Sequence, residues 1–131
     1  MKNVIKSLPV ILLLLFIFGL TSPADAHGRN TEEVEFAVLG NCGMCKDRIE
    51  RAAYTVRGVR SADWNQQTQK LTLVFRTDRT DQETVERAIA KAGHDTENFI
   101  TDEETHANLH HCCIYERNPA FLKNNKLYNE E

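Results

Sequence analysis

Strand and helix patterns alternate along the first half of the chain's central region. Polar and apolar residues alternate from Glu33 to Leu39, which predicts a half-buried strand. Apolar residues then recur at the i, i+3, i+4 and i+7 spacing of an amphipathic helix from about Met44 to Val56, and Gly58 follows where a left-handed helix end is expected. Two further strands are predicted from Val59 to Trp64 and from Lys70 to Arg76.

The second half of this region repeats the helix pattern. Thr80 and Glu83 form a capping box, and Gly93 again follows the end of an apolar stripe. The stripe consists of Val85, Ala88, Ile89 and Ala92. A short strand is expected from about Asp95 to Ile100. The order β-α-β-β-α-β predicts an α+β fold, the ferredoxin-like sandwich of two helices on a four-stranded antiparallel sheet.

A polar extension follows this domain. The sequence from Thr101 to Glu104 forms another capping box, which predicts a short helix near residues 102–109. Beyond Asn118 the content of Lys, Asn and Glu predicts a frayed tail. We therefore divide the chain into an export signal at residues 1–26, a short segment at 27–32, the domain at 33–100 and the extension at 101–131.

The first residues have the pattern of a secretory signal. Lys2 and Lys6 make a basic start, an apolar run extends from Val10 to Leu20, and Ala24-Asp25-Ala26 offers a cleavage site. The apolar run is shorter than the roughly 20 residues that span a bilayer. We therefore expect cleavage and export to the periplasm or the medium, with no membrane attachment afterwards.

The charge balance argues against one class of partner. The whole chain has a formal net charge of −3, and removal of the signal makes it slightly more acidic. A nucleic-acid partner would require a clustered basic face, which this composition does not offer. The length that remains after the signal suits one small domain.

The pair Cys42 and Cys45 lies in the loop between the first predicted strand and the first predicted helix. The unpaired N–H groups and the positive dipole end at a helix N-terminus stabilise thiolates, and Lys46 adds a positive charge next door. Two close thiolates suit a soft ion that accepts low coordination, whereas structural zinc requires four ligands. We therefore expect a metal site that favours Cu(I), with Hg(II), Ag(I) and Zn(II) as alternatives.

Two other interpretations of the cysteine pair stay open. One is a structural Cys42–Cys45 disulfide in a plain interaction domain, which export permits. The other is a periplasmic dithiol/disulfide redox protein, although the chain lacks an aromatic-Cys-Gly-Pro-Cys sequence and has the wrong strand order for a thioredoxin. Covalent haem attachment is excluded, because Lys46 and not His follows Cys45.

Two short sequences connect the chain with a known family. They are Gly40-Asn41-Cys42-Gly43-Met44-Cys45 in the first loop and Lys91-Ala92-Gly93-His94 at the end of the second helix. With them, the segment from Val34 to Ile100 resembles a heavy-metal-associated domain. The resemblance implies the ferredoxin-like fold and metal ligation by Cys42 and Cys45. The family includes copper chaperones, modules of metal-pumping ATPases and exported mercuric-ion scavengers, which implies a metal-donor or metal-acceptor protein, such as a transporter, as partner.

The chain departs from this family at two positions. Gly40 stands where the family usually has a Met that packs beneath the loop, and Met44 lies between the cysteines instead. His94 stands where the family commonly has an aromatic residue or Lys facing the metal loop. Because the fold brings that loop beside the two cysteines, His94 is a candidate ligand.

The extension holds a second group of possible ligands. The run from His106 to Cys113 contains three His and two adjacent Cys, and we take Cys112 and Cys113 as candidates that complete a three- or four-coordinate site with His94. The alternative is that this run only packs the tail onto the domain. Strand four should end away from the metal loop, and the chain from Thr101 to Cys112 spans about 18 Å as helix or over 35 Å extended, so its reach permits closure. The chain is thus interpreted as an exported carrier, not an enzyme, that sequesters a soft ion and passes it on by ligand exchange.

Overall fold

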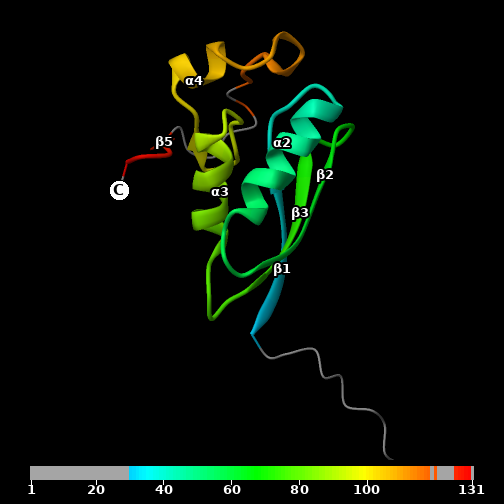
Figure 1. Ribbon diagram of the computed structural model, residues 1–131, viewed down its shortest axis with the longest axis vertical. Coiled ribbons are helices and arrows are strands. Elements are labelled where there is room, and N and C mark those ends of the chain that lie inside the picture. Colours follow the sequence, from blue (N-terminus) through cyan, green and yellow to red (C-terminus); the bar gives the residue numbers. More distant parts are fainter. Residues whose placement is uncertain (1–29, 119, 121–125, 131) are drawn as a thin grey trace, which may run out of the picture.

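The computed structural model describes residues 30–118, 120 and 126–130, so the expected export signal lies outside the described residues. Two helices pack side by side against an antiparallel sheet (Figure 1). The strands are β1 (Thr31–Ala37), β2 (Val59–Asn65) and β3 (Lys70–Arg76), in the order β1-β3-β2, and the helices are α2 (Gly43–Tyr54) and α3 (Gln82–Lys91). The α+β class and the β-α-β-β-α-β order are confirmed.

The strand register places the large apolar side chains on one face of the sheet. Both β1 and β2 pair antiparallel with β3, so that Phe36 and Trp64 lie opposite Leu71 from either side. All three side chains are buried, and each contributes about 1.5–3 kcal/mol to the free energy of unfolding. The helices bury their predicted stripes in the same core, through Ile49, Ala53, Val85 and Ile89.

The fourth strand is interrupted, in contrast to the predicted strand at residues 95–100. Next to β1 the chain forms only an isolated bridge between Val38 and Thr96. It then turns, with the Thr96 N–H donating to the Phe99 carbonyl at 2.7 Å, and β4 (Phe99–Ile100) pairs in parallel with β5 (Lys126–Leu127). The predicted position of this strand beside β1 is therefore correct, but the prediction of one continuous strand over residues 95–100 is wrong.

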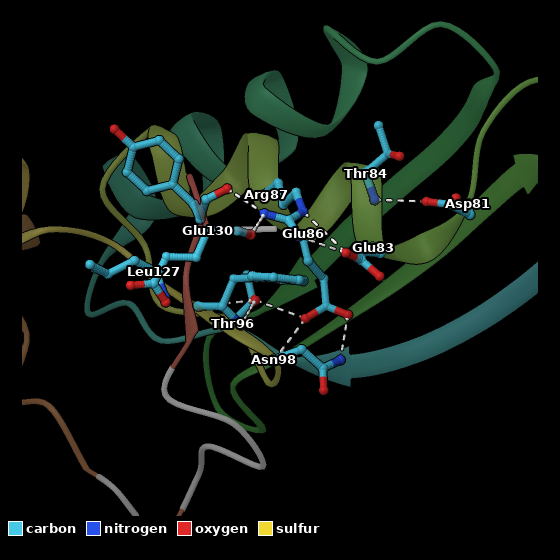
Figure 2. A network of polar contacts seen from close by, with 11 residues as sticks. Asp81, Glu83, Thr84, Glu86, Arg87, Thr96, Asn98, Leu127 and Glu130 are labelled. Carbon is cyan, nitrogen blue, oxygen red and sulfur yellow. Dashed lines mark hydrogen bonds and ion pairs between the residues drawn. The ribbon is translucent and has the colours of Figure 1, made fainter.

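A buried carboxylate explains this interruption (Figure 2). Glu86 of α3 is fully buried and accepts hydrogen bonds from the Thr96 hydroxyl at 2.8 Å and from the Asn98 backbone N–H at 3.0 Å. The Asn98 and Gln82 side-chain amides donate to it as well. Because a buried carboxylate without partners would be costly, these bonds hold residues 96–98 in a turn rather than in an extended strand.

Arg87 of α3 fixes the end of the chain. Its guanidinium donates to the backbone carbonyls of Tyr128 and Glu130 at 2.7 and 2.6 Å (Figure 2). It also lies over the Phe99 ring, at 4.3 Å from the ring centroid. Glu83 holds the same guanidinium at 2.8 Å. Residues 126–130 are therefore anchored, contrary to the predicted frayed tail, while residues 119, 121–125 and 131 lie outside the described residues.

The helix caps lie one residue later than predicted. Asp81, and not Thr80, caps α3 by accepting from the Thr84 N–H at 2.8 Å, and Asp102, and not Thr101, caps α4 (Glu103–Ala107) in the same way. A charged carboxylate is the better acceptor at the positive end of a helix than a hydroxyl. None of the helices in the described residues is long and apolar enough to cross a membrane.

Candidate metal centre

Cys42 and Cys45 lie side by side at the start of α2. Cys42 is the N-cap residue with an extended backbone, and Cys45 follows in the first turn, where the Asn41 N–H donates to its Sγ at 3.2 Å. The two Sγ atoms are 3.6 Å apart, and both cysteines are free thiols. Cys45 is fully buried whereas Cys42 is half-buried, so the pair is open to solvent through Cys42.

The extension brings two more sulfurs to this pair. After α4, the 3₁₀ helix η1 (His111–Cys113) contacts α2, at the end of the molecule where α2 begins (Figure 1). The Cys42 Sγ lies 3.1 Å from the Cys112 Sγ and 3.8 Å from the Cys113 Sγ, and the two tail sulfurs are 3.9 Å apart. In the part of the chain that the structure describes, no other set of three His, Cys, Asp or Glu groups gathers in this way.

The interrupted fourth strand gives the extension its short route to the site. The predicted unbroken strand would carry the chain away from the metal loop. Because the chain instead turns after Thr96, it leaves the edge of β1 early. Helix α4 and η1 then lie at the end of the molecule that holds the start of α2 (Figure 1).

The Cys112 sulfur has two further neighbours. The Cys112 Sγ lies 3.6 Å from the Met44 Sδ and 3.3 Å from the His110 Nδ1. Met44, whose role the sequence left unassigned, is 49% exposed. A thioether and an imidazole therefore stand at the open rim of a cluster whose inner members, Cys45 and Cys113, are fully buried.

The structure places His94 in a different environment from the sulfur cluster. Its ring is fully buried, its Nδ1 is 2.9 Å from the Leu39 carbonyl, and it stacks on the Tyr115 ring at 5.7 Å. Burial lowers the pKa of His94 from 6.5 to about 4, so the ring is neutral at physiological pH. These contacts give His94 a packing role beneath the extension, and its ligation of a metal stays a prediction.

Lys46 does not supply the positive charge that the sequence suggested for the thiolates. Its ammonium group lies between the carboxylates of Glu50 and Asp63 and donates to the Trp64 carbonyl at 2.8 Å. These contacts raise the pKa of Lys46, chiefly through the bond to Asp63. Lys46 therefore connects α2 to β2 through these contacts. The N-terminus of α2 remains as the local source of positive potential for the thiolates.

Gly40 and Trp64 shape the floor of the loop. A Cβ at position 40 would lie 2.9 Å from the Cys45 Cβ and 3.1 Å from the Trp64 ring, which leaves no room for a side chain. The Trp64 indole N–H donates to the Val38 carbonyl at 2.9 Å, which holds the ring in place. Because Gly40 has no side chain, the Trp64 ring occupies the space under the loop.

Hydrogen bonds among the thiols decide which sulfur ionises first. Burial opposes ionisation of Cys42, but hydrogen bonds from Cys112, Cys45 and Cys113 outweigh it and lower the pKa of Cys42 from 9.0 to about 7. The bond to Cys42 and burial raise the pKa of Cys112. Burial and the bond to Cys45 raise the pKa of Cys113. Cys42 is therefore the thiolate around which the other sulfurs gather.

This order predicts the pH dependence of alkylation in the reduced, metal-free chain. We expect modification of Cys42 by iodoacetamide to rise with a midpoint near pH 7, because the thiolate is the nucleophile, and modification of Cys112 to require a higher pH. Since folding lowers the Cys42 pKa from 9.0 to about 7, its stabilising effect is complete above pH 9 and is lost as the pH falls through about 7. Mass spectrometry of the alkylated peptides measures the midpoint of modification for Cys42 and for Cys112. A common midpoint at the ordinary thiol value would contradict the hydrogen-bonded cluster.

Residues 41–95 match the model of the family described as the heavy-metal-associated domain. The match confirms the resemblance inferred from the sequence. It includes Cys42, Cys45 and His94 and ends before the two tail cysteines. The comparison with curated proteins gives no match.

Several solved structures are similar to about half of the chain. A CopZ metallochaperone is 27% identical over 50% of this chain and 98% of its own, with a TM-score of 0.48. Oxidized MerP from Ralstonia metallidurans CH34 is 27% identical over 50% of this chain and 93% of its own, also with a TM-score of 0.48. The N-terminal domain of a potential copper-translocating P-type ATPase from Bacillus subtilis, solved in the Cu(I)-loaded state, has the same identity, coverage of this chain and TM-score, over 84% of its own length.

Proposed function

We propose that this chain, whose residues 41–95 match the heavy-metal-associated domain, carries a soft metal ion on the thiolates of Cys42 and Cys45. The observation that supports this most strongly is the pair of free sulfurs 3.6 Å apart at the start of a helix. The helix N-terminus stabilises negative sulfur, and paired thiolates select soft ions over hard ones. Cu(I) is the proposed ion, with Hg(II), Ag(I) and Zn(II) as alternatives.

The proposed activity is transfer of the ion, not catalysis. Cys42 is half-buried, so an incoming thiolate of a partner protein has access to an ion held there. The partner sulfur bonds to the ion as one sulfur of this chain leaves, and the oxidation state of the ion does not change. Such exchange requires no general acid or base.

The proposal extends to the place of action and to the partner. The basic start, apolar run and cleavage sequence within residues 1–26 support export to the periplasm or the medium. There the carrier would sequester the ion and exchange it with a donor or acceptor protein, such as a transporter. The mild negative charge of the chain supports a protein partner rather than nucleic acid.

Metal and thiol analysis tests the proposal. We expect the reduced chain, loaded anaerobically with Cu(I) and passed through a desalting column, to retain about one ion per chain against a competing chromophoric chelator. The same chain without metal should show all four thiols as free. A chain that retains no Cu(I), or one that instead catalyses thiol–disulfide exchange on a test disulfide, would overturn the carrier proposal.

A further inference from the structure

We infer that Cys112 and Cys113 of the extension are ligands of the same ion as Cys42, so that the tail closes the metal site into a centre of three thiolates. This inference rests on the proposed function and adds to it the composition of the site. The matched family segment ends at residue 95, so both tail sulfurs lie outside it. The ligand class is a soft ion that accepts three sulfurs, and Cu(I) is the ion used in the test below.

The sulfur positions fit such a centre. Around an ion with metal–sulfur bonds of about 2.3 Å, three sulfurs lie roughly 4.0 Å apart, and four lie roughly 3.8 Å apart. The distances from Cys113 to Cys42 and to Cys112, 3.8 and 3.9 Å, already have this length. The Cys42–Cys112 distance of 3.1 Å needs to open by about 1 Å, and Cys112 lies on the open rim where this movement is easiest.

The tail is docked by specific contacts. The Tyr115 hydroxyl is buried, donates to the Gly93 carbonyl at 3.2 Å and accepts from the Asp95 N–H at 2.6 Å. Leu109 packs on Gly93 so closely that a Cβ there would lie 2.6 Å from the Leu109 Cδ2. These contacts fix the chain on either side of the two cysteines, and the extension is therefore a built part of the domain.

A second set of contacts ties the tail to the metal loop and to the segment after α3. The Asn41 side-chain amide donates to the Ile114 carbonyl at 3.0 Å, one residue before Cys42 and one residue after Cys113. The Arg117 guanidinium lies 3.3 Å from the Asp95 carboxylate, which is fully buried. These contacts hold the pair Cys42 and Cys45 and the pair Cys112 and Cys113 in fixed positions relative to each other before any ion binds. Such preorganisation reduces the entropic cost of closing the tail ligands onto the ion.

Closure of the site by the tail would protect the ion in an exported carrier. An ion on two thiolates in an open loop is accessible to water, oxidants and foreign thiols, and the exterior lacks the reducing pool of the cytosol. In the inferred centre the thiolates of Cys112 and Cys113 cover the ion on the side of the tail. Cys42, which is 3.6 Å from Cys45 and 3.1 Å from Cys112, belongs to both pairs and allows the ion to pass from one pair to the other.

X-ray absorption at the copper edge tests the inference on the full chain, reduced and loaded anaerobically with one Cu(I). We expect about three sulfurs around the ion in the unaltered chain, from Cys42, Cys112 and Cys113. In the Cys112→Ser/Cys113→Ser variant we expect about two, because the ion then lies on the Cys42–Cys45 pair. Affinity against a chromophoric Cu(I) chelator should fall at least about tenfold in that variant. The His111→Ala variant is the matched control, because it changes η1 but removes no sulfur, and it should keep both values.

The outcomes distinguish failure of this inference from failure of the proposed function. If the double Ser variant keeps the sulfur count and affinity of the unaltered chain, the tail is not a ligand and only this inference fails. A chain that binds no Cu(I) at all overturns the proposed function with it. An equal loss in His111→Ala would also overturn the inference, because the tail would then act without its sulfurs. Circular dichroism checks that each variant folds. Cys112→Ser alone, which removes the half-buried tail sulfur, provides a milder variant in which a smaller loss of affinity is expected.

Discussion

Replacing Cys42 with serine is expected to lower the affinity of the chain for Cu(I) at least about a thousandfold, which corresponds to roughly 4 kcal/mol. The Cys42 Sγ lies within 3.8 Å of the sulfurs of all three other cysteines, so its removal breaks the Cys42–Cys45 pair and the contact with the tail together. Serine puts a hard, protonated hydroxyl in place of a soft thiolate whose pKa is lowered to about 7. Competition against a chromophoric Cu(I) chelator measures the change.

The fold should survive this substitution, which makes the result interpretable. Cys42 is the N-cap of α2 and makes no side-chain capping bond. Serine is a favoured N-cap residue, so we expect the free energy of unfolding to stay constant or to rise by up to about 1 kcal/mol. Met44→Leu is the control in the same loop, since it keeps every thiolate, and its affinity should change less than about threefold. Unchanged affinity in Cys42→Ser would exclude Cys42 as a ligand.

The sequence predicts those parts of the fold that follow from periodicity. The apolar stripes of α2 and α3 mark both helices, and Gly58 and Gly93 end them with positive φ angles of 116° and 106°. The interruption of the fourth strand is not predictable in this way. It depends on Glu86, which at its position in an amphipathic helix looks like any exposed carboxylate and is instead fully buried. Periodicity indicates the helix face on which a residue lies. It does not indicate which other segments supply hydrogen-bond partners for a buried polar side chain such as Glu86.

In the candidate site too, some features follow from the local sequence and others depend on tertiary contacts. Cys42 and Cys45 were predicted as a pair from their spacing and from their place before a helix, and the structure has them 3.6 Å apart. The approach of Cys112 could be stated only as a matter of reach, because the direction of the extension depends on where the fourth strand stops. The spacing of the cysteines does not identify Trp64 as part of the site. The absence of a side chain at Gly40 was the available signal that a large group from another element fills this space.

The Gly93→Ala variant is expected to lose about 2–4 kcal/mol of the free energy of unfolding, and it reports on the docking of the extension. Gly93 has a φ of 106°, which an alanine adopts only with strain of about 1–3 kcal/mol. In addition, its Cβ would lie 2.6 Å from the Leu109 Cδ2, in the segment that leads to the tail cysteines. Urea unfolding of the reduced, metal-free chain measures the loss. Gly43→Ala is the matched control, because its Cβ would meet nothing within 4 Å, and it should be neutral or stabilising by up to about 1 kcal/mol.

A double-mutant cycle separates backbone strain at Gly93 from the contact with Leu109. Leu109→Ala removes the atoms that the new Cβ would meet, so in that background Gly93→Ala should cost only the part that the positive φ imposes. We therefore expect the cost to be smaller by about 1 kcal/mol or more when Leu109 is already absent. This difference exists only if Leu109 packs on Gly93 in solution, which is the contact that holds the extension over the end of α3. Equal costs in the two backgrounds would show that the extension is not docked there, and would remove the structural basis for a tail thiolate at the metal site.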